Sequence, residues 1–253
     1  MEALEKYFNH YVINARLKPA FFVVLPFAIT TLAWCPEAQQ IGGAILAFLI
    51  TFGVIAFLSN LVSNLGNQLQ DKLFDIWGGA PTTALLRHSD NILDAYTKQR
   101  YHKWLESRLP GLVMPCPESE ASNPVSADNI YASAANFLRE YTRNKTKYPM
   151  VYSDNVAYGF ARNLLVMRPI GIGVVLFSIF LNLVFLYANF IKAEESLHNL
   201  IDHKISMVIF GSGAIAASVT LLLITTFTVN QTYVHGRAIR YAKSLLAVCE
   251  EIN

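Results

Sequence analysis

Residues 169–191 read PIGIGVVLFSIFLNLVFLYANFI, a run of 23 uncharged positions between Arg168 and Lys192. About 20 apolar residues in a helix cover the roughly 30 Å hydrocarbon core of a bilayer. A helix also satisfies its own backbone hydrogen bonds, which water does not reach at that depth. This stretch therefore predicts a transmembrane helix.

Three more uncharged runs have comparable lengths: 18 residues before Glu37, 33 residues between Glu37 and Asp71, and 32 residues between Lys204 and Arg237. Only 15% of all residues are charged, whereas soluble domains carry about 25%, and the mean hydropathy is +0.34. Four all-round apolar helices buried in one soluble core are the less favoured alternative. The sequence thus predicts an all-α membrane protein with four transmembrane helices, over about 19–36, 40–63, 169–191 and 206–230.

The basic residues predict the orientation of these helices. Of the 20 Lys and Arg residues, 18 lie outside the short connections at 36–39 and 192–205, and by the positive-inside rule they mark the cytoplasmic side. We expect both termini in the cytoplasm and two hairpins separated by a mostly helical cytoplasmic insertion between helices 2 and 3. The expected segments are an amphipathic arm at 1–18, hairpins at 19–63 and 169–230, a cytoplasmic region at 64–168 and a C-terminal helix at 231–253.

Polar side chains form a stripe on the predicted second helix. Asn60, Asn64 and Asn67 recur at helical spacing, and Ser59 and Ser63 lie beside them. Because amides are costly in hydrocarbon, such a stripe either lines a water-filled pathway or bonds to a neighbouring helix. We take these five residues as candidate pore-lining positions; in a homo-oligomer one stripe can serve both purposes.

The four predicted spans contain no Asp, Glu, Lys, Arg or His. Proton-coupled transporters and voltage sensors place ionisable groups at depth, so these classes are disfavoured. A pore walled by apolar, Asn, Ser and Thr side chains, which gates by dewetting, is compatible with the sequence. In the fourth span the small residues at 211–218 predict close approach of another helix backbone.

Two clusters in the 64–168 region interleave cations with aromatic rings. Guanidinium and ammonium groups beside stacking rings suit a ligand that carries phosphates and bases. The alternative is a solvated helix face near anionic lipid headgroups. The candidate ligand-binding residues of the first cluster are Arg87, Lys98, Arg100, Tyr101 and Lys103, and those of the second cluster are Arg139, Arg143, Lys145 and Lys147.

Helical periodicity in the same region runs through about 65–76, 82–107, 127–146 and 152–168. Thr82 or Thr83 is the expected N-cap after a Gly-Gly-Ala-Pro turn, and Asp128 is the expected cap of the later helix. We expect the proline-rich stretch at 110–124 to form a long exposed loop.

Sequence motifs of enzymes are absent: there is no phosphate loop, no Gly-x-Ser-x-Gly elbow and no His-Glu-x-x-His pair. The three cysteines have no metal-ligand spacing, so we expect unpaired thiols. We therefore expect no catalytic residue, no metal and no cofactor. An integral-membrane enzyme built on His88, Asp90 or His102 is the weakest hypothesis.

Residues 77–83 read WGGAPTT and are followed by Leu86 and Arg87. This segment and the layout of the whole chain resemble the channel subunits of the Hailong anti-phage system, small membrane effectors of bacterial defence operons. The resemblance implies a homotetrameric channel in the bacterial inner membrane, encoded beside a nucleotidyltransferase. It also implies that single-stranded oligodeoxyadenylate holds the channel closed, and that such a ligand binds at the basic and aromatic positions above.

The sequence thus favours a homo-oligomeric, ligand-gated channel or pore-forming effector of anti-phage defence. A nucleotide or single-stranded oligonucleotide on the cytoplasmic region would control opening and membrane depolarisation. The alternative is a membrane scaffold whose cytoplasmic region binds a partner protein.

Overall fold

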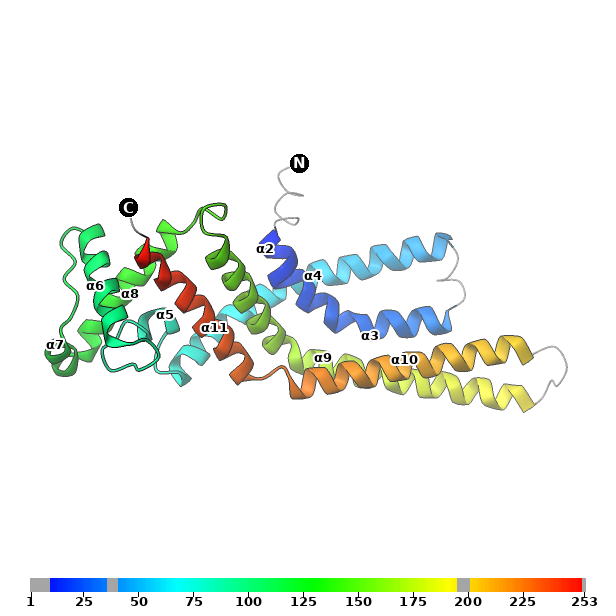
Figure 1. Ribbon diagram of the computed structural model, residues 1–253. Coiled ribbons are helices and arrows are strands. Elements are labelled where there is room, and N and C mark those ends of the chain that lie inside the picture. The colour runs from blue at the N-terminus through cyan, green and yellow to red at the C-terminus, as the bar shows by residue number, and fades with distance from the viewer. Residues whose placement is uncertain (1–9, 36–40, 195–200, 252–253) are drawn as a thin grey trace. The chain divides into compact units, whose positions relative to one another are not determined.

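The computed structural model describes residues 10–35, 41–194 and 201–251, and these residues form helices and connections without a strand. The helices, coloured along the chain in Figure 1, are α2 (His10–Val12), the π-helix η1 (Ile13–Leu17), α3 (Lys18–Trp34), α4 (Ile41–Ile76), α5 (Pro81–Ala84), α6 (Ala95–Arg108), α7 (Pro117–Ser122), α8 (Pro124–Tyr141), α9 (Pro149–Glu194), α10 (Ile201–Phe227), α11 (Gln231–Leu246) and the 3₁₀-helix η3 (Ala247–Glu250). The all-α prediction is confirmed.

Among the residues that the structure describes, three helical stretches are long and apolar enough to cross a membrane: His10–Trp34, Pro149–Asn189 and Val208–Phe227. They coincide with the first, third and fourth predicted spans, so the chain has the helices of a membrane protein. The second predicted span, 40–63, falls on α4 apart from residue 40, which lies outside the described residues. Its passage through a membrane stays a prediction, as does the hairpin layout, because the turns at 36–40 and 195–200 also lie outside them.

The backbone is helical across the predicted boundary between the N-terminal arm and the first span, and the boundary itself stays a prediction. Helical backbone runs from His10 through the π-helix into α3, and Lys18 itself has helical dihedral angles, φ −60° and ψ −48°. Residues 1–9 of the predicted arm lie outside the described residues. The described part of the arm is therefore the first turns of a membrane-length helix.

Two compact units divide the chain. The first unit holds residues 1–67 and 160–233, and the second unit holds residues 68–159 and 234–253. Helices α4 and α9 each contribute residues to both units. The second unit contains most of the predicted cytoplasmic region together with the predicted C-terminal helix.

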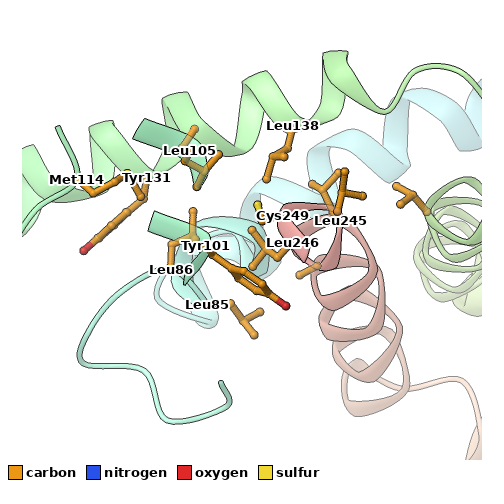
Figure 2. Close-up of a cluster of buried hydrophobic side chains, with 14 of the residues drawn as sticks. Leu85, Leu86, Tyr101, Leu105, Met114, Tyr131, Leu138, Leu245, Leu246 and Cys249 are labelled. Atoms are coloured by element: carbon orange, nitrogen blue, oxygen red, sulfur yellow. The ribbon is translucent and has the colours of Figure 1, made fainter. Parts of the chain in front are cut away.

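Hydrophobic side chains from the turn after α5, from α6 and α8, and from the C-terminal helices form the core of the second unit. Figure 2 shows Leu105, Leu138 and Cys249 pointing into one cluster, which also contains Leu85, Leu86, Tyr101, Met114, Tyr131, Leu245 and Leu246. Each fully buried apolar side chain contributes roughly 1.5–3 kcal/mol. The C-terminal helix is therefore part of this core, and burial raises the pKa of the Cys249 thiol to about 12.

The predicted single helix over 82–107 is wrong, because the chain leaves helical geometry between Ala84 and Ala95. Leu85 and Leu86 are buried in the core, and Asp94 starts a new helix by accepting a hydrogen bond from the Thr97 amide (2.9 Å). Helix propensity alone does not predict this break, because the break depends on the burial of Leu85 and Leu86 in the core.

Three further local predictions are wrong. The stretch at 110–124 is not one exposed loop, because it contains α7 and the buried side chain of Glu120. Asn123, not Asp128, caps α8 through the Ser126 amide (3.1 Å), because Pro124 starts that helix one turn earlier than predicted. Neither predicted threonine acts as a cap, since α5 follows Ala80 without a side-chain cap.

In the first unit, a polar network joins α3 to α9. Trp34 Nε1 donates to Asn182 Oδ1 (2.7 Å), and Asn182 Nδ2 donates to Thr30 Oγ1 (2.7 Å). Gly211 on α10 faces the Trp34 ring so closely that a Cβ would overlap it. The small-residue block therefore admits the Trp34 ring of α3 at Gly211, and α3 packs closely on α10.

Candidate pore face and ligand-binding surface

The predicted asparagine stripe lies on an exposed face of α4. Asn60, Asn64 and Asn67 are all exposed in the chain. Phe57, which precedes Asn60 by one turn on the same face, is 70% exposed. The exposed face thus passes from an aromatic ring to three amides.

The opposite face of α4 is packed. Ser59 is only 2% exposed, and Val62 lies in a hydrophobic cluster with Val23 and Met167. Ser63 is half-buried between the two faces. The structure therefore brings the three asparagines together and separates Ser59 from them.

A contact at Gly66 fixes the rotation of α4 about its axis. A Cβ at Gly66 would overlap the side-chain oxygen of Asn163 on α9. Asn163 in turn donates Nδ2 to the carbonyl oxygen of Ala15 (2.6 Å) in the π-helix, where wide turns leave carbonyls free for such partners. Because Gly66 must face Asn163, the asparagine stripe must face away from α9.

Four aromatic rings form a row in the second unit. Tyr148 is buried in the core, and the other three rings are half-buried against it. Trp104 on α6 meets Tyr141 on α8 edge to face, with ring centroids 5.6 Å apart. Tyr141 also lies 5.7 Å from Phe137 and 5.8 Å from Tyr148. Two cations lie over these rings: Arg108 over Trp104 (5.4 Å), and Lys147 over Tyr148 (4.9 Å) and Tyr141 (5.5 Å). We call these six residues the aromatic–cation surface.

The remaining cations of the second predicted cluster are exposed nearby in sequence. Lys145 lies over the Tyr152 ring (5.3 Å), and Arg143 pairs with Glu140 on the same helix end (2.9 Å). Arg139 is exposed on α8. The charges of this cluster therefore lie at the surface, which a binding site for phosphates requires.

Carboxylates from the C-terminus contact both predicted clusters. Glu250 binds Arg100 (2.8 Å), and Glu251 lies 3.6 Å from Lys147 and accepts a hydrogen bond from the Tyr148 hydroxyl (3.3 Å). A hydrogen bond with Tyr148 raises the pKa of Lys147.

Three candidates of the first cluster have structural partners instead. Arg87 forms a two-pronged ion pair with Asp128, with both N···O distances 2.7 Å. Lys98 is 4% exposed and donates to the carbonyl oxygens of Arg87 (2.8 Å), His88 (3.4 Å) and Asp90. Tyr101 is buried in the core. Of this cluster, Arg100 and Lys103 remain exposed.

Residues 77–83 form the turn that contacts Arg87. Gly78 and Gly79 have φ angles of +74° and +135°, which favour glycine. Gly78 offers its carbonyl oxygen to Arg87 Nη2 (2.8 Å), and a Cβ on Gly79 would lie 2.7 Å from the same nitrogen. The hydrogen bond to Asp128 raises the pKa of Arg87, so the arginine stays charged.

The buried carboxylate of Glu120 is the centre of a hydrogen-bond network. Its carboxylate accepts hydrogen bonds from the Tyr131 hydroxyl (2.6 Å) and from the amides of His88 (2.7 Å) and Ser89 (3.0 Å). Burial raises the pKa of Glu120, but these bonds more than offset it and the pKa falls to about 2. Burial also lowers the pKa of His102 and raises that of Tyr131.

The three residues of the enzyme hypothesis, His88, Asp90 and His102, form hydrogen bonds with the backbone. His88 Nε2 lies 2.8 Å from the Pro115 carbonyl oxygen and His102 Nε2 lies 2.9 Å from that of Leu86, so each ring nitrogen must donate. Asp90 accepts from the Ile92 amide (2.8 Å). Within the described residues, no three His, Cys, Asp or Glu side chains are placed to hold a metal ion.

Sequence reasoning missed two parts of these sites. Arg108 follows Trp104 by four residues, which is helical spacing for a cation over a ring, so this signal was present in the sequence. The role of Glu250 and Glu251 had no local signal, because their partners lie far away in the chain.

Comparison of the chain with models of protein families, with curated proteins and with solved structures finds no match.

Proposed function

We propose that this protein is a homo-oligomeric, ligand-gated membrane channel of bacterial anti-phage defence. The observation that carries the proposal is the exposed stripe of Asn60, Asn64 and Asn67 on α4, whose opposite face is packed. A stripe of amides facing outward from an otherwise apolar helix calls for water or for a copy of itself. Copies arranged around an axis provide both.

In such an assembly the α4 faces line the pathway for ions. Rings of asparagine side chains, which are neutral, would solvate passing ions without placing a fixed charge in the pore. The ring of Phe57 side chains would form an apolar constriction one turn away. Narrow apolar constrictions close by dewetting and open with small increases in radius. The proposed closed state therefore requires only a small rotation or tilt of α4.

The aromatic–cation surface is the proposed site of the controlling ligand, a nucleotide or a single-stranded oligonucleotide. Its ring centroids are 5.6–5.8 Å apart. A base has a face that can stack on the half-buried rings of Trp104, Phe137 and Tyr141, at about 1–3 kcal/mol per base. Arg108 and Lys147 lie over the rings, where they can pair with phosphates. Exposed cations of this kind make binding weaken steeply with salt.

The resemblance to the Hailong subunits specifies this proposal further. It favours a tetramer in the inner membrane, oligodeoxyadenylate as the ligand that keeps the pore closed, and a nucleotidyltransferase encoded nearby. A polyanion that bridges several copies would hold α4 in one arrangement, and its loss would release the other.

Reconstitution into liposomes tests the pore. We expect the purified protein to release a trapped fluorescent ion indicator, and Asn64→Leu to abolish release while the assembly stays intact. The matched control is Thr220→Leu, since Thr220 is also exposed on a membrane-length helix but lies on α10. Equal release by wild type and Asn64→Leu, or no release with or without oligonucleotide, would disprove the proposal.

A membrane scaffold is the second candidate, and large exposed apolar side chains on the second unit favour it. Tyr96, Val113 and Val125 are each more than 70% exposed, which suits a protein partner. A stoichiometric partner that co-purifies with the wild type but not with Val113→Asp, together with zero conductance, would favour this function.

A further inference from the structure

We infer that the second unit binds a small alkylammonium cation, in a cavity lined by Arg87, Glu120 and Asp128. This inference goes beyond the proposed function. None of the lining residues belongs to the aromatic–cation surface, and the inference holds whether or not the protein conducts ions.

The cavity has a volume of about 640 Å³, within the range of roughly 300–1,000 Å³ that is typical of small-molecule sites. Its lining residues all lie between Gly78 and Asp128, and therefore in one compact unit. They come from the turn at 78, from residues 87–89 after α5, from α7 and from the first turns of α8.

The charged lining residues carry a net negative charge. Asp128 cancels the charge of Arg87 by binding its Nε and Nη2 atoms, both at 2.7 Å. The partners of Glu120 are uncharged, namely the Tyr131 hydroxyl and the backbone amides of residues 88 and 89. Burial raises the pKa of Glu120, but these hydrogen bonds outweigh it and lower the pKa to about 2, so the carboxylate is ionised at neutral pH. The cavity therefore favours a cation over an anion.

Hydrogen-bond acceptors in the cavity remain unused. A carboxylate offers about four lone-pair positions, and Arg87 occupies two of those on Asp128. The Asp128 side chain is 38% exposed, so a ligand can reach the others. His88 Nε2 donates to the Pro115 carbonyl oxygen (2.8 Å), which leaves Nδ1 of the neutral ring as an acceptor. An ammonium group, with three N–H donors and no acceptor, complements these atoms.

The rest of the wall is apolar and suits methylene groups. Pro117 and Ala121 on α7 and Pro124 at the start of α8 line the cavity, and all three are exposed. Covering such surface contributes roughly 0.8 kcal/mol per methylene group. A metal ion fits less well, because no three His, Cys, Asp or Glu side chains of the described residues are placed to hold one. An alkyl chain that ends in an ammonium group matches both the charge and the walls.

Two kinds of metabolite present such a group: a free diamine and a basic amino acid. Arg87 distinguishes between them. Within the described residues, its hydrogen bonds to the protein use Nε and Nη2. The two N–H groups of Nη1 are therefore left for the α-carboxylate of an amino acid.

Isothermal titration calorimetry of the full chain in detergent tests the inference, with cadaverine as the probe and 1,5-pentanediol as its uncharged counterpart of equal length. We expect one cadaverine bound per chain and no binding of pentanediol. L-Lysine is cadaverine with an added α-carboxylate, so tighter binding of lysine indicates a basic amino acid and weaker binding indicates a diamine. Asp128→Asn should weaken cadaverine binding about tenfold, because it removes a charge-assisted hydrogen bond.

Because Asp128 also holds Arg87, a second variant leaves the hydrogen bonds of the cavity in place. The ring of Ala121→Phe would fill the cavity, and we expect it to weaken cadaverine binding by at least as much as Asp128→Asn does. Ser122→Phe is the matched control, since Ser122 is also exposed on α7 but does not line the cavity. Loss of binding in Ala121→Phe with binding kept in Ser122→Phe supports the site. No binding by the wild type, equal binding of pentanediol, or equal loss in the two phenylalanine variants overturns the inference.

Discussion

The two basic clusters of the second unit look alike in the sequence and differ in the fold. In the first cluster, Arg87 and Lys98 are taken up by protein oxygens: a carboxylate for the arginine and backbone carbonyls for the lysine. In the second cluster, Lys145 and Lys147 lie exposed over tyrosine rings. The comparison shows that a cation is available to a ligand only where the fold has not already satisfied it, which composition does not reveal.

The largest effect expected from this comparison is on stability. Lys98→Met leaves several buried carbonyl groups without a donor, and we expect it to lower the free energy of unfolding of the second unit by about 3 kcal/mol. Lys103→Met, on the same helix but exposed, should change it by less than about 0.5 kcal/mol. Chemical denaturation followed by tryptophan fluorescence measures both, and equal effects of the two variants would contradict the assignment.

A second effect concerns the dependence of stability on pH. Because the pKa of Glu120 falls from 4.5 to about 2 on folding, its contribution is fully present above pH 4.5 and is lost as the pH falls toward 2, in total about 3 kcal/mol. His102, whose pKa is lowered by burial, adds a loss of the same sign below pH 6.5. Thermal unfolding of Glu120→Gln between pH 6 and pH 2 should show a shallower decline than the wild type. A parallel decline would assign the acid sensitivity to other groups.

The smallest effect concerns ligand binding and leaves stability nearly unchanged. Tyr141→Leu keeps an apolar side chain in the half-buried position but removes a stacking ring, and we expect oligodeoxyadenylate to bind about tenfold more weakly. Tyr96→Leu is the matched control, because Tyr96 is exposed on α6 apart from the ring row. Fluorescence anisotropy at two salt concentrations gives both affinities. If the two variants bind alike, the aromatic–cation surface is not the ligand site.

Several features could be predicted because their signals are local. Membrane-length helices follow from uncharged runs. The asparagine stripe follows from helical spacing, and the structure adds that its amides are exposed on α4. The break between α5 and α6 could not be predicted, since it depends on Leu85 and Leu86 entering a core built partly from the C-terminal helix. The ion pair of Arg87 could not be predicted for the same reason, because its partner Asp128 lies 41 residues away.

The sequence by itself determined that this chain is helical, that its charges are segregated from long apolar stretches, and where asparagines line one face of a helix. These are properties of neighbouring residues, and helical periodicity carries them directly. Only the tertiary structure decided which face of α4 stays open, through Asn163 bonding a carbonyl 148 residues away. It also decided which cations face solvent, because the energy of a charge depends on the oxygens that the fold brings to it.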